Sequence, residues 1–124
     1  MTWRFFTEAE MRCRGTGRCE MDPGFMARLE ALREEYARPM AVTSGFRAPE
    51  YNVRVSSSGS DGPHTTGRAV DIAVRGKDAL DLVVLAVKHG FTGIGIKQDG
   101  LGRFVHLDDL EEIPGRPRPW LWSY

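Results

Sequence analysis

Two residues stand out because each lies where a polar side chain is unexpected. His64 follows a loop rich in glycine and serine, and Asp71 is a lone carboxylate on an otherwise apolar stretch seven residues later. Burying a carboxylate without a partner costs several kcal/mol. A metal ion would satisfy Asp71, and its small neighbours on the same strand face, Ala69 and Ala73, leave room beside the carboxylate.

A third candidate, His106, lies in the segment Phe-Val-His-Leu-Asp. Strand alternation places Phe104, His106 and Asp108 on one face, whereas the two apolar residues between them face the core. Two histidines and one aspartate are a sound ligand set for zinc and leave a fourth position for water. The residue types therefore suit a catalytic rather than a structural zinc site.

Each of these residues also has an ordinary interpretation. Taken alone, His64 is a loop residue, and His106 is a hydrogen-bonded strand histidine. Asp71 is then an ion-pair partner of Arg68 or Arg75. Composition and spacing do not bring the three residues together in space, so both interpretations stay open at this point.

Two long helices and one short one are predicted. Thr7 and Glu10 have the spacing of a capping box, which indicates a short helix ending near Cys13. Asp22 and a following proline indicate the start of an amphipathic helix over residues 23–37. The second long helix covers residues 77–89. Its apolar face is predicted to hold Leu80, Val83, Val84 and Val87.

The remaining pattern predicts an α+β fold. Short strands are expected over residues 40–44, 68–74, 91–96 and 103–108, and residues 49–55 form one or two helical turns. Residues 56–63 are expected to be a flexible loop. The sum is a single domain, residues 1–124, with a small, mainly antiparallel sheet packed by two main helices.

The segment from His64 to Asp71, His-Thr-Thr-Gly-Arg-Ala-Val-Asp, resembles the His-x-x-Gly-x-Ala-x-Asp signature of the zinc D-alanyl-D-alanine carboxypeptidase family, peptidase family M15. That family includes phage endolysins and shares a metal site with hedgehog domains. Residues 44–47, Ser-Gly-Phe-Arg, are similar to its Ser-Gly-Tyr-Arg segment. Residues 93–96 and 104–108 are similar to its Gly-x-Gly and Phe-x-His-x-Asp strands. One departure is Gly62, where the family usually has serine.

The resemblance implies a fold of the hedgehog and DD-peptidase type and one zinc ion held by His64, Asp71 and His106. It also implies that the chain hydrolyses a peptide bond in peptidoglycan stem peptides, either D-Ala-D-Ala or L-Ala-D-Glu. Arg47 is implied to bind the substrate and polarise its carbonyl. A guanidinium can hold a carboxylate through two parallel hydrogen bonds or stabilise a developing oxyanion. The substrate-binding residues implied beside Arg47 are Ser44 and Asn52.

The general base does not lie where the resemblance places it. Several members have Glu or Asp three residues before the last histidine ligand, and this sequence has Arg103 there. We expect Asp108 to act as the base, because it shares a strand face with His106; a role in orienting a ligand fits Asp108 equally well. Asp109 and Asp99 are weaker candidates.

Two functions without catalysis fit the same residues. One is a zinc module that acts through partner binding, as hedgehog domains do. The other is a virion or cell-wall attachment protein that uses the aromatic tail, residues 120–124, although such a tail more commonly packs over its own domain.

Composition excludes some classes of partner. Seventeen acidic residues balance seventeen basic ones, so a whole-domain basic footprint for nucleic acid is absent. The longest apolar stretch, residues 82–87, is far shorter than a membrane span. The first residues carry no secretory signal pattern, so we expect synthesis in the cytoplasm and action on the cell wall after release or phage delivery.

Cys13 and Cys19 are either packing thiols or a loop-closing pair. We expect a monomer.

Overall fold

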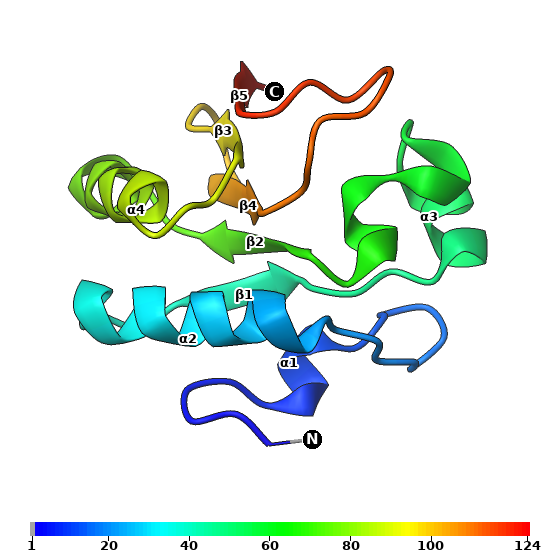
Figure 1. The fold of residues 1–124 in the computed structure, drawn as a ribbon, viewed down its shortest axis with the longest axis horizontal. Helices are drawn as coiled ribbons and strands as arrows, with labels where there is room; N and C mark the ends of the chain where they lie inside the picture. The colour runs from blue at the N-terminus through cyan, green and yellow to red at the C-terminus, as the bar shows by residue number, and fades with distance from the viewer. Residues whose placement is uncertain (1) are drawn as a thin grey trace.

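A five-stranded sheet positions every other element of the protein. The computed structural model describes residues 2–124, and its strands follow the order β1-β2-β4-β3-β5 across the sheet (Figure 1). The strands are β1 (Ala41–Ser44), β2 (Ala69–Ala73), β3 (Gly93–Lys97), β4 (Phe104–Asp108) and β5 (Trp120–Ser123). All neighbouring pairs are antiparallel except β3 and β5, which are parallel. The predicted α+β fold with a mainly antiparallel sheet is therefore confirmed.

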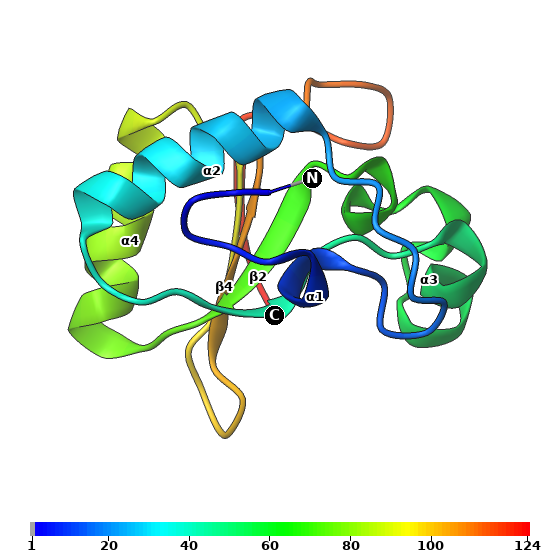
Figure 2. The same ribbon diagram turned by 90° about the horizontal axis from the view of Figure 1, so that it is seen from below.

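The helices divide between the two faces of the sheet. Figure 2 shows α4 (Gly76–Lys88) and α3 (Pro49–Val55) on opposite sides of the strands, with α2 (Pro23–Tyr36) near α4. The core lies between the sheet and the two long helices. Its sheet side is formed by Val70 and Ile72 of β2 and by Val105 and Leu107 of β4, none more than 1% exposed. The opposite face is left for polar residues under α3.

Local capping explains where α1 (Glu8–Met11) and α2 begin. The Thr7 hydroxyl accepts a hydrogen bond from the Glu10 amide (3.2 Å), and the Glu10 carboxylate accepts one from the Thr7 amide (2.9 Å), so the predicted capping box is confirmed. Helix α1 ends at Met11 because Arg12 is already extended, which makes the predicted end near Cys13 too late. Asp22 Oδ2 accepts from the Phe25 amide at 2.8 Å and caps α2 as predicted.

The predicted apolar face of α4 is wrong at three of its four residues, and only Val83 packs, partly buried, against the core. Leu80, Val84 and Val87 are 64%, 60% and 61% exposed, whereas the buried residues of α4 are Ala79, Leu82 and Ala86. The helix is apolar around most of its circumference, so spacing alone did not select one stripe. Turning the two alanines inward lets the helix lie close to the sheet.

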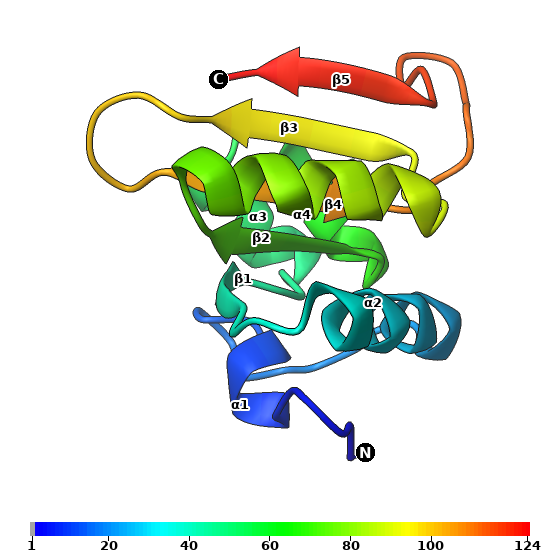
Figure 3. The same ribbon diagram turned by 90° about the vertical axis from the view of Figure 1, so that its left-hand side faces the viewer.

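The segment expected to be a flexible loop, and also the aromatic tail, have regular structure. The glycine- and serine-rich loop contains the 3₁₀ turn η1 (Gly59–Asp61), and a second turn, η2 (Pro63–Thr66), follows it. The aromatic tail forms β5, which pairs with β3 at the opposite edge of the sheet from β1 (Figure 3). The tail thus packs on its own domain. Among the described residues, no helix has both the length and the apolarity that crossing a bilayer requires.

Candidate metal centre

Strand register brings Asp71 and His106 side by side. Asp71 of β2 pairs with His106 of β4, which in turn pairs with Gly95 of β3. Trp122 of β5 pairs with Gly95 on its other side, and Ser44 of β1 pairs with Asp71. Directly paired residues point to the same face of a sheet. One row across all five strands therefore carries the carboxylate and one of the two histidines, on the face turned away from α2 and α4.

His64 reaches the same place from η2. The chain turns from η2 into β2 through Gly67, whose φ of +73° is in the left-handed region. A side chain at Gly67 would also overlap the Glu20 carbonyl oxygen, so both the turn and the close packing require glycine. The His64 ring is oriented by its Nδ1, which lies 2.8 Å from the Gly45 carbonyl oxygen.

The three side chains form one buried cluster. His64 Nε2 lies 3.3 Å from Asp71 Oδ1, and His106 Nδ1 lies 3.1 Å from the same oxygen. Candidate ligand atoms of the three residues all lie within 4.8 Å of one another, and all three residues are buried. Ligands bound tetrahedrally at about 2.0–2.1 Å from zinc lie about 3.3 Å apart. The spacing of the cluster thus suits a single small cation.

The hydrogen-bond partners of the two histidine rings also favour a cation in the cluster. His64 Nδ1 faces a carbonyl oxygen, and His106 Nε2 faces the Asp108 carboxylate at 2.7 Å. Both partners only accept hydrogen bonds, so the proton of each neutral ring lies on this outer nitrogen. The two inner nitrogens then present lone pairs toward the Asp71 carboxylate. Such a buried group of acceptors is stable with a cation between its members, or with further protons on the rings.

The charges of the cluster are strongly coupled. Burial raises the pKa of Asp71, but its contacts with His106 and His64 outweigh burial and hold that pKa well below its usual range. Burial lowers the pKa of His106, but its contacts with Asp108 and Asp71 raise it overall. Asp71 is therefore ionised at neutral pH and available as a ligand.

Asp108 lies behind His106. Its Oδ2 contacts the far ring nitrogen of His106, and both its oxygens accept hydrogen bonds from Arg118, at 2.9 and 2.8 Å. Burial raises its pKa, but the bonds to His106 and Arg118 lower it well below the usual range. The side chain of Asp108 is fully buried and does not line the neighbouring pocket. This is the geometry of a residue that orients a ligand, the alternative to the base role predicted from sequence.

A pocket of about 450 Å³ opens over the cluster. Its lining comes from the connection between β1 and α3, from the end of α3 and the loop after it, from η2, from the cluster itself and from aromatic residues of β4, β5 and the C-terminus: Arg47, Val55, Ser56, Ser57, Ser58, Pro63, His64, Asp71, Phe104, His106, Trp122 and Tyr124. A cavity with an apolar wall and a few convergent polar groups is the usual form of a small-molecule or peptide site.

Of the three residues implied to bind substrate, only Arg47 lines this pocket. Its Nη2 lies 3.9 Å from Asp71 Oδ2, and its Nη1 donates to Asn52 Oδ1 at 3.1 Å. Asn52 is fully buried and also donates to Ser58 Oγ (2.9 Å) and to the Gly59 carbonyl. Asn52 therefore holds Arg47 and the serine loop in place. Ser44 is buried beside Asp71.

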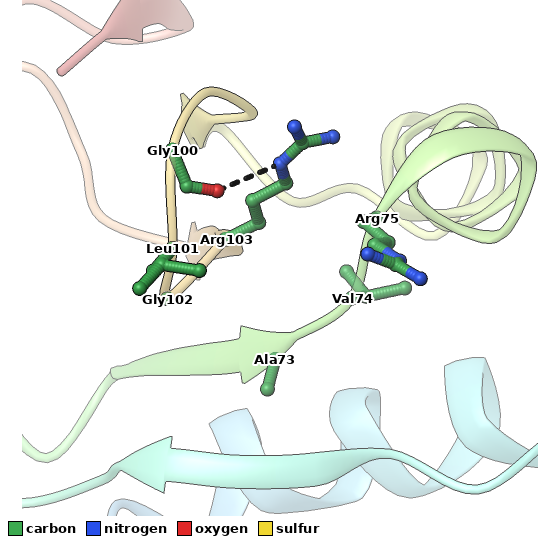
Figure 4. A pocket seen from close by; sticks show the side chains of 7 residues that line it. All are labelled: Ala73, Val74, Arg75, Gly100, Leu101, Gly102 and Arg103. Atoms are coloured by element: carbon green, nitrogen blue, oxygen red, sulfur yellow. Dashed lines mark hydrogen bonds between the residues drawn. The ribbon is translucent and has the colours of Figure 1, made fainter.

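The other candidate bases lie away from the cluster. Arg103, at the position expected for a base, extends from the β3–β4 hairpin, and its Nε donates to the Gly100 carbonyl at 3.1 Å (Figure 4). It lines a separate pocket with Ala73 and Arg75. Asp99 is exposed, and Asp109 is paired with Arg68 and Arg28. The arginine that lies beside Asp71 is Arg47, whereas the sequence suggested Arg68 or Arg75 as its ion-pair partner.

The aromatic residues that line the pocket, Phe104, Trp122 and Tyr124, were not predicted from the sequence as part of the site. The Trp122 ring lies 5.0 Å from the His106 ring, and the Tyr124 ring lies 4.9 Å from that of Phe104. Trp122 fits because Gly95 beneath it has no side chain; a Cβ there would lie 2.6 Å from the indole. Alternation in Trp-Leu-Trp-Ser-Tyr was the available signal, since it places Trp122 and Tyr124 on one strand face.

Both cysteines lie outside this centre. Cys13 is buried and Cys19 is partly buried, and both are free thiols. Neither belongs to the group of candidate metal ligands, so the packing-thiol interpretation fits the structure.

The chain matches the model of a known protein family. The model of the family described as peptidase M15 matches residues 4–108, which include His64, Asp71, His106 and Asp108. A search of curated proteins finds no match.

Proposed function

Because the chain belongs to the peptidase M15 family, we propose that it is a zinc-dependent hydrolase of peptide bonds in peptidoglycan stem peptides. The main support for the proposal is the buried cluster of His64, Asp71 and His106 at the floor of a pocket. The types of these three ligands and the spacing of their atoms fit a zinc ion. Zinc, when bound, polarises the scissile carbonyl and activates water for attack near neutral pH.

The side chains around the cluster have separate tasks in this proposal. Arg47 binds a substrate carboxylate near the scissile bond or stabilises the developing oxyanion. Its position is held by Asn52, so the guanidinium is preorganised rather than free. Trp122 and Tyr124 form the apolar wall against which the peptide lies. Asp108 keeps the His106 ring oriented.

The experiment that tests the proposal is digestion of purified peptidoglycan by the zinc-loaded protein, with product identification by mass. Release of terminal D-Ala indicates a carboxypeptidase, and cleavage between L-Ala and D-Glu indicates an endopeptidase. The R47M variant should retain zinc but lose about 100- to 1,000-fold in kcat, the usual scale for losing one preorganised electrostatic contact. R54M is the matched control, because Arg54 contacts the Tyr51 ring and does not line the pocket.

A zinc module without catalysis is the second candidate. It is favoured by Arg103 at the position expected for a base and by the engagement of both Asp108 oxygens. That candidate predicts zinc binding together with intact peptidoglycan after prolonged digestion. In either case the protein reaches its target at the cell wall after release or phage delivery.

A further inference from the structure

Arg118 lies beyond the residues that match the family, yet its side chain is buried against the back of the metal centre. Only 6% of that side chain is exposed, and none of Asp108 is. We propose that Arg118 is a positioning residue, which acts through Asp108 to hold the His106 ring in the orientation that metal binding needs. This inference rests on the proposed metal centre and adds to it a part supplied by the C-terminal segment.

The contacts form one continuous chain. Arg118 donates from Nε to Asp108 Oδ1 and from Nη2 to Asp108 Oδ2. The same Oδ2 contacts His106 Nε2 at 2.7 Å, and His106 Nδ1 faces Asp71 at 3.1 Å. A two-pronged contact fixes both the position and the plane of a carboxylate, which a single bond does not. The plane of Asp108 in turn sets the direction of the His106 ring.

The surroundings of Arg118 are shaped for this contact. Gly93, opposite Asp108 in the sheet, has no side chain, and a Cβ there would overlap the Asp108 carboxylate. The Arg118 guanidinium also lies 5.1 Å from the centre of the Trp122 ring, which itself packs near His106. Among the arginines and lysines of residues 2–124, Arg118 is the one that forms an ion pair with Asp108. Its removal would leave a buried carboxylate beside a metal ligand without its counter-charge.

The test compares R118M and R118K with R116M. Arg116 is the matched control, because it lies in the same segment and donates to the Glu111 carbonyl instead of to the metal centre. Zinc affinity is measured by competition with a chromophoric chelator, and the ligand field is measured from the absorption spectrum of the cobalt-substituted protein. We expect R118M to lower zinc affinity about 10- to 100-fold and to shift the cobalt spectrum, as loss of a residue that orients a ligand does. R116M should match the wild type in both.

R118K keeps the charge but not the two-pronged contact, so it should fall between the wild type and R118M. If R118M does not fold, the same two measurements on R118K decide. Wild-type affinity together with a wild-type cobalt spectrum in the folded variant overturns the proposal, whatever the change in thermal stability. A wild-type protein that binds no zinc overturns the metal centre and this inference together. A wild-type protein that binds zinc but cleaves nothing overturns only the peptidase activity.

Discussion

Replacing Asp108 with alanine separates its two candidate roles. The side chain is fully buried and accepts hydrogen bonds from Arg118 and from the Leu110 amide, besides its contact with His106. Alanine would leave the buried Arg118 guanidinium unpaired. Removing one partner of a buried ion pair costs about 3–5 kcal/mol. An accessible general base, in contrast, can be removed with little loss of stability.

The expected shift in melting temperature follows from the size of the chain. An unfolding entropy of about 2.1 cal/mol/K per residue gives roughly 0.26 kcal/mol/K for 124 residues. A loss of about 3–5 kcal/mol then lowers Tm by roughly 12–19 °C. The measurement is thermal unfolding of metal-free protein in chelator, followed by circular dichroism, so that lost zinc does not contribute.

D99A is the control for this variant. The Asp99 side chain is 84% exposed and pairs with the neighbouring Lys97, so its removal should change Tm by about 2 °C or less. The orienting role of Asp108 is refuted if D108A unfolds within about 3 °C of the wild type while peptidoglycan cleavage is lost. That result would identify Asp108 as an accessible catalytic group, as strand alternation first suggested.

Three further predictions concern the row of residues across the sheet and the pocket wall. G95A should lower the free energy of unfolding by about 1–3 kcal/mol and change tryptophan fluorescence, because the new methyl group displaces the Trp122 ring; an unchanged emission spectrum would contradict this packing. Y124A should raise KM for stem peptides with zinc content unchanged, since Tyr124 lines the pocket and is not one of the candidate metal ligands. Y124F should retain most of the binding. Equal KM values in the wild type, Y124A and Y124F would contradict a role of Tyr124 in substrate binding. The stabilisation by zinc should grow as pH rises from about 6 to 8. The pKa of His106 is raised in the fold, so the stability that its proton contributes is present below the unfolded value near 6.5 and is lost as pH rises through the folded pKa. A zinc-induced rise in Tm that shrinks over this range would contradict the assignment.

The candidate metal centre was predictable because its residues break a local pattern. A carboxylate on an apolar strand and a histidine in an alternating one both require a partner, and these signals are local in sequence. Resemblance to a known family then joined His64, Asp71 and His106, which spacing alone did not. That Asp71 and His106 share one face is a finding of the strand register, which pairs the two residues directly.

The features that sequence missed depend on contacts between distant segments. Strand β5 pairs in parallel with β3, and no turn signal marks a parallel pairing. The places of Trp122 and Tyr124 in the pocket follow from that pairing. The inward face of α4 was predicted wrongly for a similar reason. Packing against the sheet, and not the helix sequence alone, determines which of its apolar stripes is buried. The contact of Asp108 with Arg118 likewise needs the chain to return after β4.

We propose that His64, Asp71 and His106 together hold one metal ion. This is tested by the zinc content of purified wild-type, H64A and D71N proteins, measured by elemental analysis after exposure to excess zinc and removal of unbound metal. We predict one zinc per chain in the wild type and loss of zinc from both variants, with each variant folded by circular dichroism. A wild-type protein without bound metal, or a folded D71N variant that retains zinc with wild-type affinity, would contradict the claim.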